Sequence, residues 1–237
     1  TSMEATKDQA EYIRDGLDYD YWKENIHTVL KKGNIHKMHM MMTINSLCLT
    51  TITEFMDEML EIRDEYGQRA PSMTLNILRF PSFQSAAILP EHIKTFYKEK
   101  LQNWFSGDNA QSKLHDGEKA SVQRLIDYLD IVKTPHKNTA ETPKLYHDFK
   151  TFFEQYDVRR NKDFRETFKG PIADWYEKLK AEVPTKEDIL VKKDTIKIYN
   201  RAGDPATTES YEGGDDVHEK VGGWDTENDA LGGVKVE

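Results

Sequence analysis

The stretch that decides the fold is Met38-His39-Met40-Met41-Met42-Thr43-Ile44-Asn45-Ser46, which is soon followed by Thr51-Ile52-Thr53-Glu54. A largely apolar run ends in a polar asparagine, and a short loop then leads into a helix signal. Parallel strands deliver polar side chains in this way to the carboxyl edge of a sheet, where open α/β folds bind ligands. The pattern predicts a strand over residues 36–44, with Asn45 at its ligand-facing end.

Helices and strands alternate around this strand. Apolar spacing predicts helices over residues 20–32 and 51–66, and Thr51 with Glu54 has the spacing of a capping box. Residues 73–80 form a further strand, and residues 1–6 are the end of an earlier one, with a polar connection and turn over residues 7–16. This order predicts two right-handed βαβ crossovers and a parallel sheet. Because so small a sheet has exposed edges and position 1 is not methionine, we expect the chain to be part of a longer protein.

The remainder of the chain is first helical and then acidic. Helices are predicted over residues 92–105, 119–132, 145–156 and 174–181, with a loop over 134–142. Beyond residue 200, Gly, Asp, Glu and Thr dominate, and too little apolar surface remains for independent folding. We therefore expect an α/β unit at residues 1–90, a mainly helical extension at 91–200 and a disordered, flexible acidic tail at 201–237.

Composition excludes several function classes. The chain has 237 residues, 37% of them hydrophobic, which suffices for one sizeable core. A net charge of -9 argues against non-specific binding to nucleic acid or anionic membranes. Neither a membrane-spanning run nor a signal peptide is evident, so a cytoplasmic protein is expected. The single cysteine, Cys48, excludes an internal disulfide and any zinc or iron–sulfur site built from cysteines of this chain alone.

Two polar residues are the main candidates for ligand contacts. Asn45 is placed to hydrogen-bond a ribose or a carboxylate, or else it is a polar loop residue or helix cap. Arg14 follows the first strand and is able to clamp a carboxylate in bidentate fashion, or else it is an ordinary surface arginine. No metal site is expected, because His36 and His39 would point to opposite faces of a strand.

Two further features have mainly structural interpretations. Cys48 lies in the loop after Asn45, but it has no evident histidine partner and is interpreted as a small, semi-buried residue rather than a nucleophile. The polar cluster at residues 156–161 either binds an anion or is an ion-paired helix end, and the second interpretation is favoured.

The chain resembles the second half of radical SAM proteins of the twitch type. The resemblance covers about residues 1–180 and rests on EYIRDGLD at 11–18, WKENI at 22–26, MTINSL at 42–47, TEFMD at 53–57, TLNILRFPS at 74–82, FFEQYDVRR at 152–160, DFRETF at 163–168 and DWY at 174–176. It implies the carboxyl-terminal half of a partial (β/α)6 barrel, with residues 1–4, 36–44 and 73–80 as strands four, five and six. The CxxxCxxC loop that holds the [4Fe-4S] cluster of the family is absent from this chain.

The resemblance also implies a set of cofactor contacts. Carried over by position, Ser2, Glu4, Arg14 and Asn45 are implied to contact S-adenosylmethionine, while Leu78 and Arg79 approach its adenine or the substrate. The implied parent enzyme cleaves S-adenosylmethionine reductively at its cluster and generates a radical on an unknown substrate, for instance a peptide. Two alternatives stay open. One is a non-catalytic protein-interaction module that uses the aromatic helices and the acidic tail, and the other is a degenerate barrel kept as a scaffold.

Overall fold

The sheet consists of two parallel strands extended by the amino terminus. The computed structural model describes residues 1–33, 35–131 and 141–182. In it β1 (His39–Ile44) pairs in parallel with β2 (Ser72–Ile77), and the register runs from His39 opposite Ser72 to Ile44 opposite Ile77. On the other side of β1, Ser2 forms a parallel bridge with Met41. The predicted parallel direction is confirmed, but the strand predicted over 73–80 ends at Ile77.

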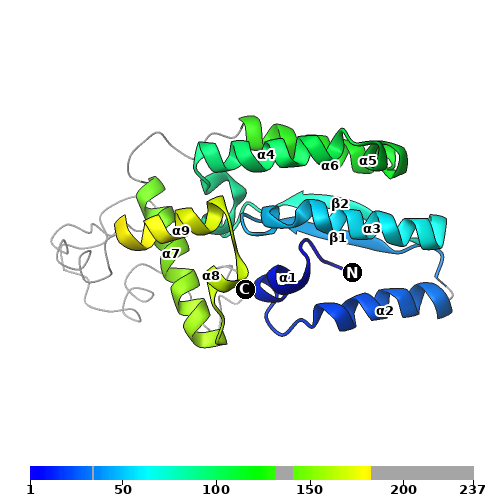
Figure 1. Ribbon diagram of the computed structural model, residues 1–237, viewed down its shortest axis with the longest axis horizontal. Coiled ribbons are helices and arrows are strands. Elements are labelled where there is room, and N and C mark those ends of the chain that lie inside the picture. Colours follow the sequence, from blue (N-terminus) through cyan, green and yellow to red (C-terminus); the bar gives the residue numbers. More distant parts are fainter. Residues whose placement is uncertain (34, 132–140, 183–237) are drawn as a thin grey trace, which may run out of the picture. The chain divides into compact units, whose positions relative to one another are not determined.

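Most described residues are helical, so the fold is a mixed α/β arrangement with a small sheet (Figure 1). The helices are α1 (Lys7–Ile13), α2 (Tyr19–Lys32), α3 (Ile52–Tyr66), α4 (Glu91–Phe105), α5 (Asp108–Lys113), α6 (Asp116–Ile131), α7 (Glu141–Arg160), α8 (Phe164–Thr167) and α9 (Pro171–Glu182). No described helix is both long and apolar enough to cross a membrane. Most of the predicted loop over 134–142 and the whole predicted tail over 201–237 lie outside the described residues.

Two local predictions were wrong. Residues 7–13 were predicted as a polar connection but form α1, which buries Ala10 and Tyr12. The capping box at Thr51 does not form, because its side chain makes no cap hydrogen bond and instead accepts the Thr6 N–H at 3.3 Å. Glu54 turns away from the helix start and binds Lys100 at 2.7 Å.

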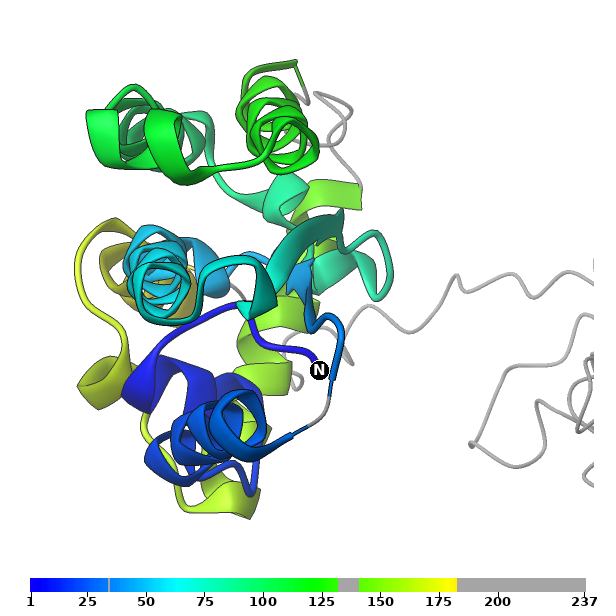
Figure 2. The same cartoon turned by 90° about the vertical axis from the view of Figure 1, so that its right-hand side faces the viewer.

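The two faces of the sheet differ in their surroundings. Met40, Met42 and Ile44 are fully buried, together with Phe55 and Met56 of α3. Figure 2 shows α3 lying against this face. The residues that alternate with them point the other way, as strand geometry requires, and Met41 is 50% exposed while Thr43 and Asn76 are also exposed.

The outer edge of β2 is closed by side chains of α6. Glu118 accepts the Met73 N–H at 2.8 Å, and Arg124 donates to the carbonyl of Leu75. Glu118 is also held by Arg63 of α3 through two hydrogen bonds of 2.7 Å. Backbone groups that a further strand would use are thereby satisfied, which protects this edge from pairing with other chains.

Helices α7 to α9 lie beyond the carboxyl end of the strands (Figure 1). An aromatic cluster fixes them to α1, with Tyr12 at its centre. The ring of Tyr12 lies 5.0 Å from Phe168 and 5.9 Å from Phe164, both edge-on. Its hydroxyl donates to Asp157 at 2.6 Å. The helical extension therefore covers the end of the sheet at which parallel strands present their polar residues.

Candidate functional site

Glu4 and Arg14 form a bidentate ion pair beside β1. The bridge between Ser2 and Met41 sets Glu4 level with Thr43, whose N–H lies 3.5 Å from Oε2 of Glu4. Arg14 donates from Nε to Oε1 at 3.1 Å and from Nη2 to Oε2 at 2.6 Å. The Glu4 side chain is 3% exposed and that of Arg14 is 33% exposed. Arg14 therefore does hold a carboxylate in bidentate fashion, but this carboxylate belongs to the protein and not to a ligand.

One edge of the Arg14 guanidinium stays available. Its Nη1 has no hydrogen bond to any residue that the structure describes. A planar guanidinium can bind two carboxylates through different edges. Since Glu4 holds Nε and Nη2, it fixes the plane of the group, and the Arg14 side chain as a whole stays 33% exposed.

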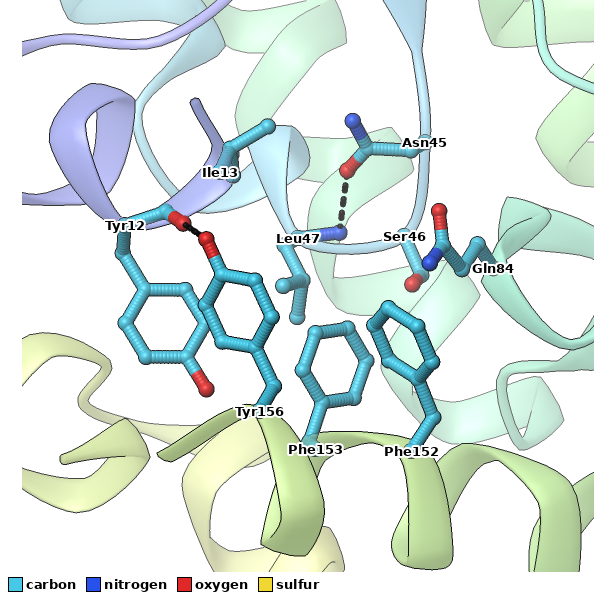
Figure 3. Close-up of a pocket in the computed structure, with 9 residues that line it drawn as sticks. All are labelled: Tyr12, Ile13, Asn45, Ser46, Leu47, Gln84, Phe152, Phe153 and Tyr156. Atoms are coloured by element: carbon cyan, nitrogen blue, oxygen red, sulfur yellow. Dashed lines mark hydrogen bonds between the residues drawn. The ribbon is translucent and has the colours of Figure 1, made fainter. Parts of the chain in front are cut away.

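Asn45 shapes the loop after β1. Its Oδ1 accepts the N–H of Leu47 at 2.9 Å (Figure 3) and that of Cys48 at 3.0 Å. Its Nδ2 donates to the carbonyl of Thr43 at 3.4 Å. This is the turn that asparagine often builds through its own side chain. The geometry matches the loop-cap alternative, because the oxygen that would contact a ligand is occupied.

Cys48 belongs to the same loop and is a structural residue. It is fully buried, and its thiol donates to the Asn45 carbonyl at 3.2 Å. Burial, and to a smaller extent the charge of Glu4, raises the pKa of this thiol. A buried thiol that stays protonated is a poor nucleophile.

The other residues carried over from the resemblance lie apart from this group. Ser2 is exposed and pairs with Met41, which is four residues before Asn45, or about 13 Å along a strand. Leu78 is half-buried, and its N–H donates to the Ile44 carbonyl at 2.9 Å. Arg79 is exposed. The structure thus brings Glu4 and Arg14 together, sets Leu78 at the end of the sheet, and leaves Ser2 near its middle.

The polar cluster at residues 156–161 is an ion-paired helix end, as favoured. Arg160 binds Asp15 at 2.8 Å. Asp157 accepts the Tyr12 hydroxyl and the Phe164 N–H, the latter at 3.0 Å. These contacts join α7 to α1, to the turn that follows α1 and to α8.

A small slot opens between the end of the sheet and α7 (Figure 3). Its volume is about 70 Å³, and its lining comprises Tyr12, Ile13, Asn45, Ser46, Leu47, Gln84, Phe152, Phe153 and Tyr156. Tyr156 donates from its hydroxyl to the Tyr12 carbonyl at 2.7 Å. None of the lining residues is charged, and pockets for drug-sized ligands are several times larger, about 300–1,000 Å³.

Sequence reasoning singled out Asn45 but missed most of this slot. Gln84 and the rings of α7 come from segments far apart in the chain, and no local motif joins them. The available signal was the aromatic spacing of Phe149, Phe152 and Phe153, which predicts a helix face but gives no information on what it faces.

No family model, curated protein or solved structure matches the chain.

Proposed function

We propose that this chain is the carboxyl-terminal half of a partial (β/α)6 barrel and provides part of the S-adenosylmethionine pocket of a radical SAM enzyme. The observation that carries the proposal is the two-sided character of the sheet. Helix α3 covers one face, while Met41, Thr43 and Asn76 leave the other exposed in the part of the chain that the structure describes. In a (β/α) barrel the helices lie outside and the inner strand faces enclose the interior. The exposed face is therefore assigned to the barrel interior.

Arg14 fits the carboxylate of the cofactor. It lies beside the exposed face, held level with Thr43 by Glu4, and its free Nη1 is a charge-assisted donor. Glu4 is a positioning residue, because it is 3% exposed and acts through Arg14. Asn45 does not fit as a direct contact, since its Oδ1 is held by the loop. Its part in the proposal is to shape the loop that follows β1.

The reductive cleavage chemistry is supplied by S-adenosylmethionine and a [4Fe-4S] cluster when both are bound. Cys48 is the only cysteine of this chain, and its buried thiol does not fit a cluster ligand. The cluster ligands are therefore assigned to sequence outside this chain. On this proposal the partners are the cofactor and a peptide or protein substrate, and the enzyme works in the cytoplasm.

The test is a titration of the full chain with S-adenosylmethionine, in which binding is monitored by ¹H–¹⁵N NMR. We expect shifts at the Arg14 side chain and the amides of β1, and a loss of affinity of about tenfold for Arg14→Lys, because lysine cannot hold two carboxylates in one plane. Arg69→Lys is the matched control. Arg69 donates to the Gly33 carbonyl at 2.9 Å and precedes β2, so it lies at the amino end of the sheet.

If Arg14→Lys and Arg69→Lys bind S-adenosylmethionine with equal affinity, Arg14 does not contact the cofactor. The absence of any shift in the unmodified chain would contradict the proposal and favour the interaction module or the degenerate scaffold. The outcomes are distinct, because the first leaves binding intact and the second abolishes it.

A further inference from the structure

One residue that lines the slot beside α7 has a buried hydroxyl. Ser46 is fully buried, and its backbone N–H donates to the Gln84 carbonyl at 2.8 Å. Its Oγ has no hydrogen-bond partner among the described residues. A hydroxyl removed from water and left unpaired costs free energy, so buried hydroxyls nearly always have partners. An exception that lines a cavity points to a missing partner.

The neighbouring polar groups do not share this feature. The Asn45 oxygen is taken by the loop, and the Tyr156 hydroxyl is taken by the Tyr12 carbonyl. Gln84 contributes a carboxamide to the same lining as Ser46. Figure 3 shows Ser46 and Gln84 on one side of the slot, with the rings of Phe152 and Phe153 opposite. The slot therefore combines one polar wall with one aromatic wall.

The charge of the lining and the volume of the slot limit the kind of chemical group that can bind there. The lining contains no acidic or basic side chain, so a charged group would lose its hydration without gaining a counter-charge. The volume of about 70 Å³ is roughly twice the share of one molecule in liquid water, about 30 Å³. The uncharged lining and the small volume favour a neutral group of a few heavy atoms.

We infer that this slot binds the terminal carboxamide of a larger molecule, such as a substrate with an asparagine- or glutamine-like end. A carboxamide is planar and neutral, and it carries both a donor and an acceptor. Its carbonyl accepts the Ser46 hydroxyl, its amino group donates to the Gln84 side-chain oxygen, and its flat face and apolar stem lie against Phe152. Neither Glu4 nor Arg14 lines the slot, so the inference goes beyond the proposed function and can fail separately from it.

The probe is propionamide, added to the full chain and followed by ¹H–¹⁵N NMR. We expect the largest shifts at the amides of Ser46, Leu47 and Gln84. Propionate, which has the same shape but is charged, should bind about tenfold more weakly or not at all. Shifts of equal size with both probes, or shifts scattered over the surface, would contradict the inference.

Substitution of two buried serines separates binding from folding. Ser46→Ala should weaken propionamide binding about fivefold or more, and it should leave the thermal midpoint unchanged or raised, because the lost hydroxyl has no partner. Ser85 is the matched control, since it is 5% exposed but its Oγ accepts the Ala87 N–H at 3.3 Å and pairs with the Tyr128 hydroxyl at 3.2 Å.

Ser85→Ala should therefore lower the thermal midpoint and leave propionamide binding as it is. If Ser46→Ala destabilises the chain as much as Ser85→Ala, the Ser46 hydroxyl has a structural partner and the inference is wrong. Undiminished propionamide binding by Ser46→Ala would likewise overturn it. Arg14→Lys should leave this titration unchanged, which keeps the outcome independent of cofactor binding.

Discussion

The described part of the chain contains two bidentate Arg–Glu pairs, which differ in how many of their hydrogen-bonding groups bind other parts of the protein. Arg63 makes four hydrogen bonds: two to Glu118 at 2.7 Å, one to the Lys113 carbonyl at 2.7 Å and one to the Pro71 carbonyl at 3.0 Å. Its side chain is 10% exposed. Among the described residues Arg14 makes two hydrogen bonds, both to Glu4, and its side chain is 33% exposed.

The difference separates a structural pair from a candidate functional one. Glu118 accepts two backbone N–H groups in addition to Arg63, those of Met73 and His115, each at 2.8 Å. Every partner of that pair is protein, so its role is to join α3, β2 and α6. In the pair of Glu4 and Arg14, by contrast, the Nη1 donors make no hydrogen bond to a described residue, and the Arg14 side chain is partly exposed. Unused hydrogen-bonding capacity, rather than the presence of charge, is what makes Arg14 the candidate ligand contact of the proposed function.

The largest expected effect follows from breaking the buried ion pair of Arg63 and Glu118. Glu118→Gln leaves the Arg63 charge nearly buried and without a counter-charge, which should lower the free energy of unfolding by about 3–5 kcal/mol. Urea denaturation followed by circular dichroism measures it. Asp64→Asn is the control, because the pair of Asp64 and Lys113 is exposed, at 57% and 30%, and should cost less than about 1 kcal/mol. Similar losses in both variants would contradict the structural role of the buried pair.

The next effect is the pH dependence of the same pair. Burial alone would raise the pKa of Glu118, but the hydrogen bonds from Arg63, His115 and Met73 outweigh it, and the pKa is lowered. The unfolded chain, with a glutamate pKa of about 4.3, then binds more protons than the folded chain in this range. The stabilisation is therefore present above about pH 4.3 and is lost as the pH falls through the lower folded value.

The measurement is the difference in unfolding free energy between the unmodified chain and Glu118→Gln, followed from pH 7 to acid. That difference should be constant above about pH 4.3 and shrink below it. Other acids cancel in the subtraction. A difference that grows on acidification would show that the pKa of Glu118 is raised on folding.

A smaller effect is expected from breaking the ion pair of Glu4 and Arg14. Glu4→Gln should lower the free energy of unfolding by about 1–2 kcal/mol, because Arg14 can turn its charge toward solvent. The same variant should weaken S-adenosylmethionine binding, since the plane of the guanidinium is no longer fixed. A loss as large as that of Glu118→Gln would show that the two pairs are equally structural.

These two pairs also show what the sequence could predict. The resemblance named Glu4 and Arg14 as separate ligand contacts, yet the pattern of residues does not reveal that they bind each other, because the contact depends on the angle between the first segment and α1. The strands β1 and β2 and helices α3, α4 and α6 were placed within a few residues, since each has an extended apolar pattern. Helices α1, α5 and α8 are too short for such a pattern and were missed.

The candidate site was predictable in position more than in role. Asn45 does lie at the end of β1, as expected, but its oxygen caps N–H groups two and three residues further on. A ligand contact and a loop cap both use an asparagine at this position, so only the three-dimensional structure distinguishes the two roles. Ser46 gave no signal at all, because a serine next to an asparagine in a loop is ordinary until its surroundings are known to be apolar.

The smallest expected effect is that of Arg14→Lys, with Arg63→Lys as the comparison. Arg14→Lys retains one contact with Glu4 and should change the free energy of unfolding by less than about 1 kcal/mol, while Arg63→Lys loses the planar donors that reach two carbonyls and should cost about 2–3 kcal/mol. Denaturation curves of the two variants, measured side by side, provide the comparison. If Arg14→Lys is as destabilising as Arg63→Lys, its weaker cofactor binding would reflect damage to the fold. A nearly unchanged stability would instead assign the whole loss of affinity to the Nη1 edge of the guanidinium, which binds none of the residues that the structure describes.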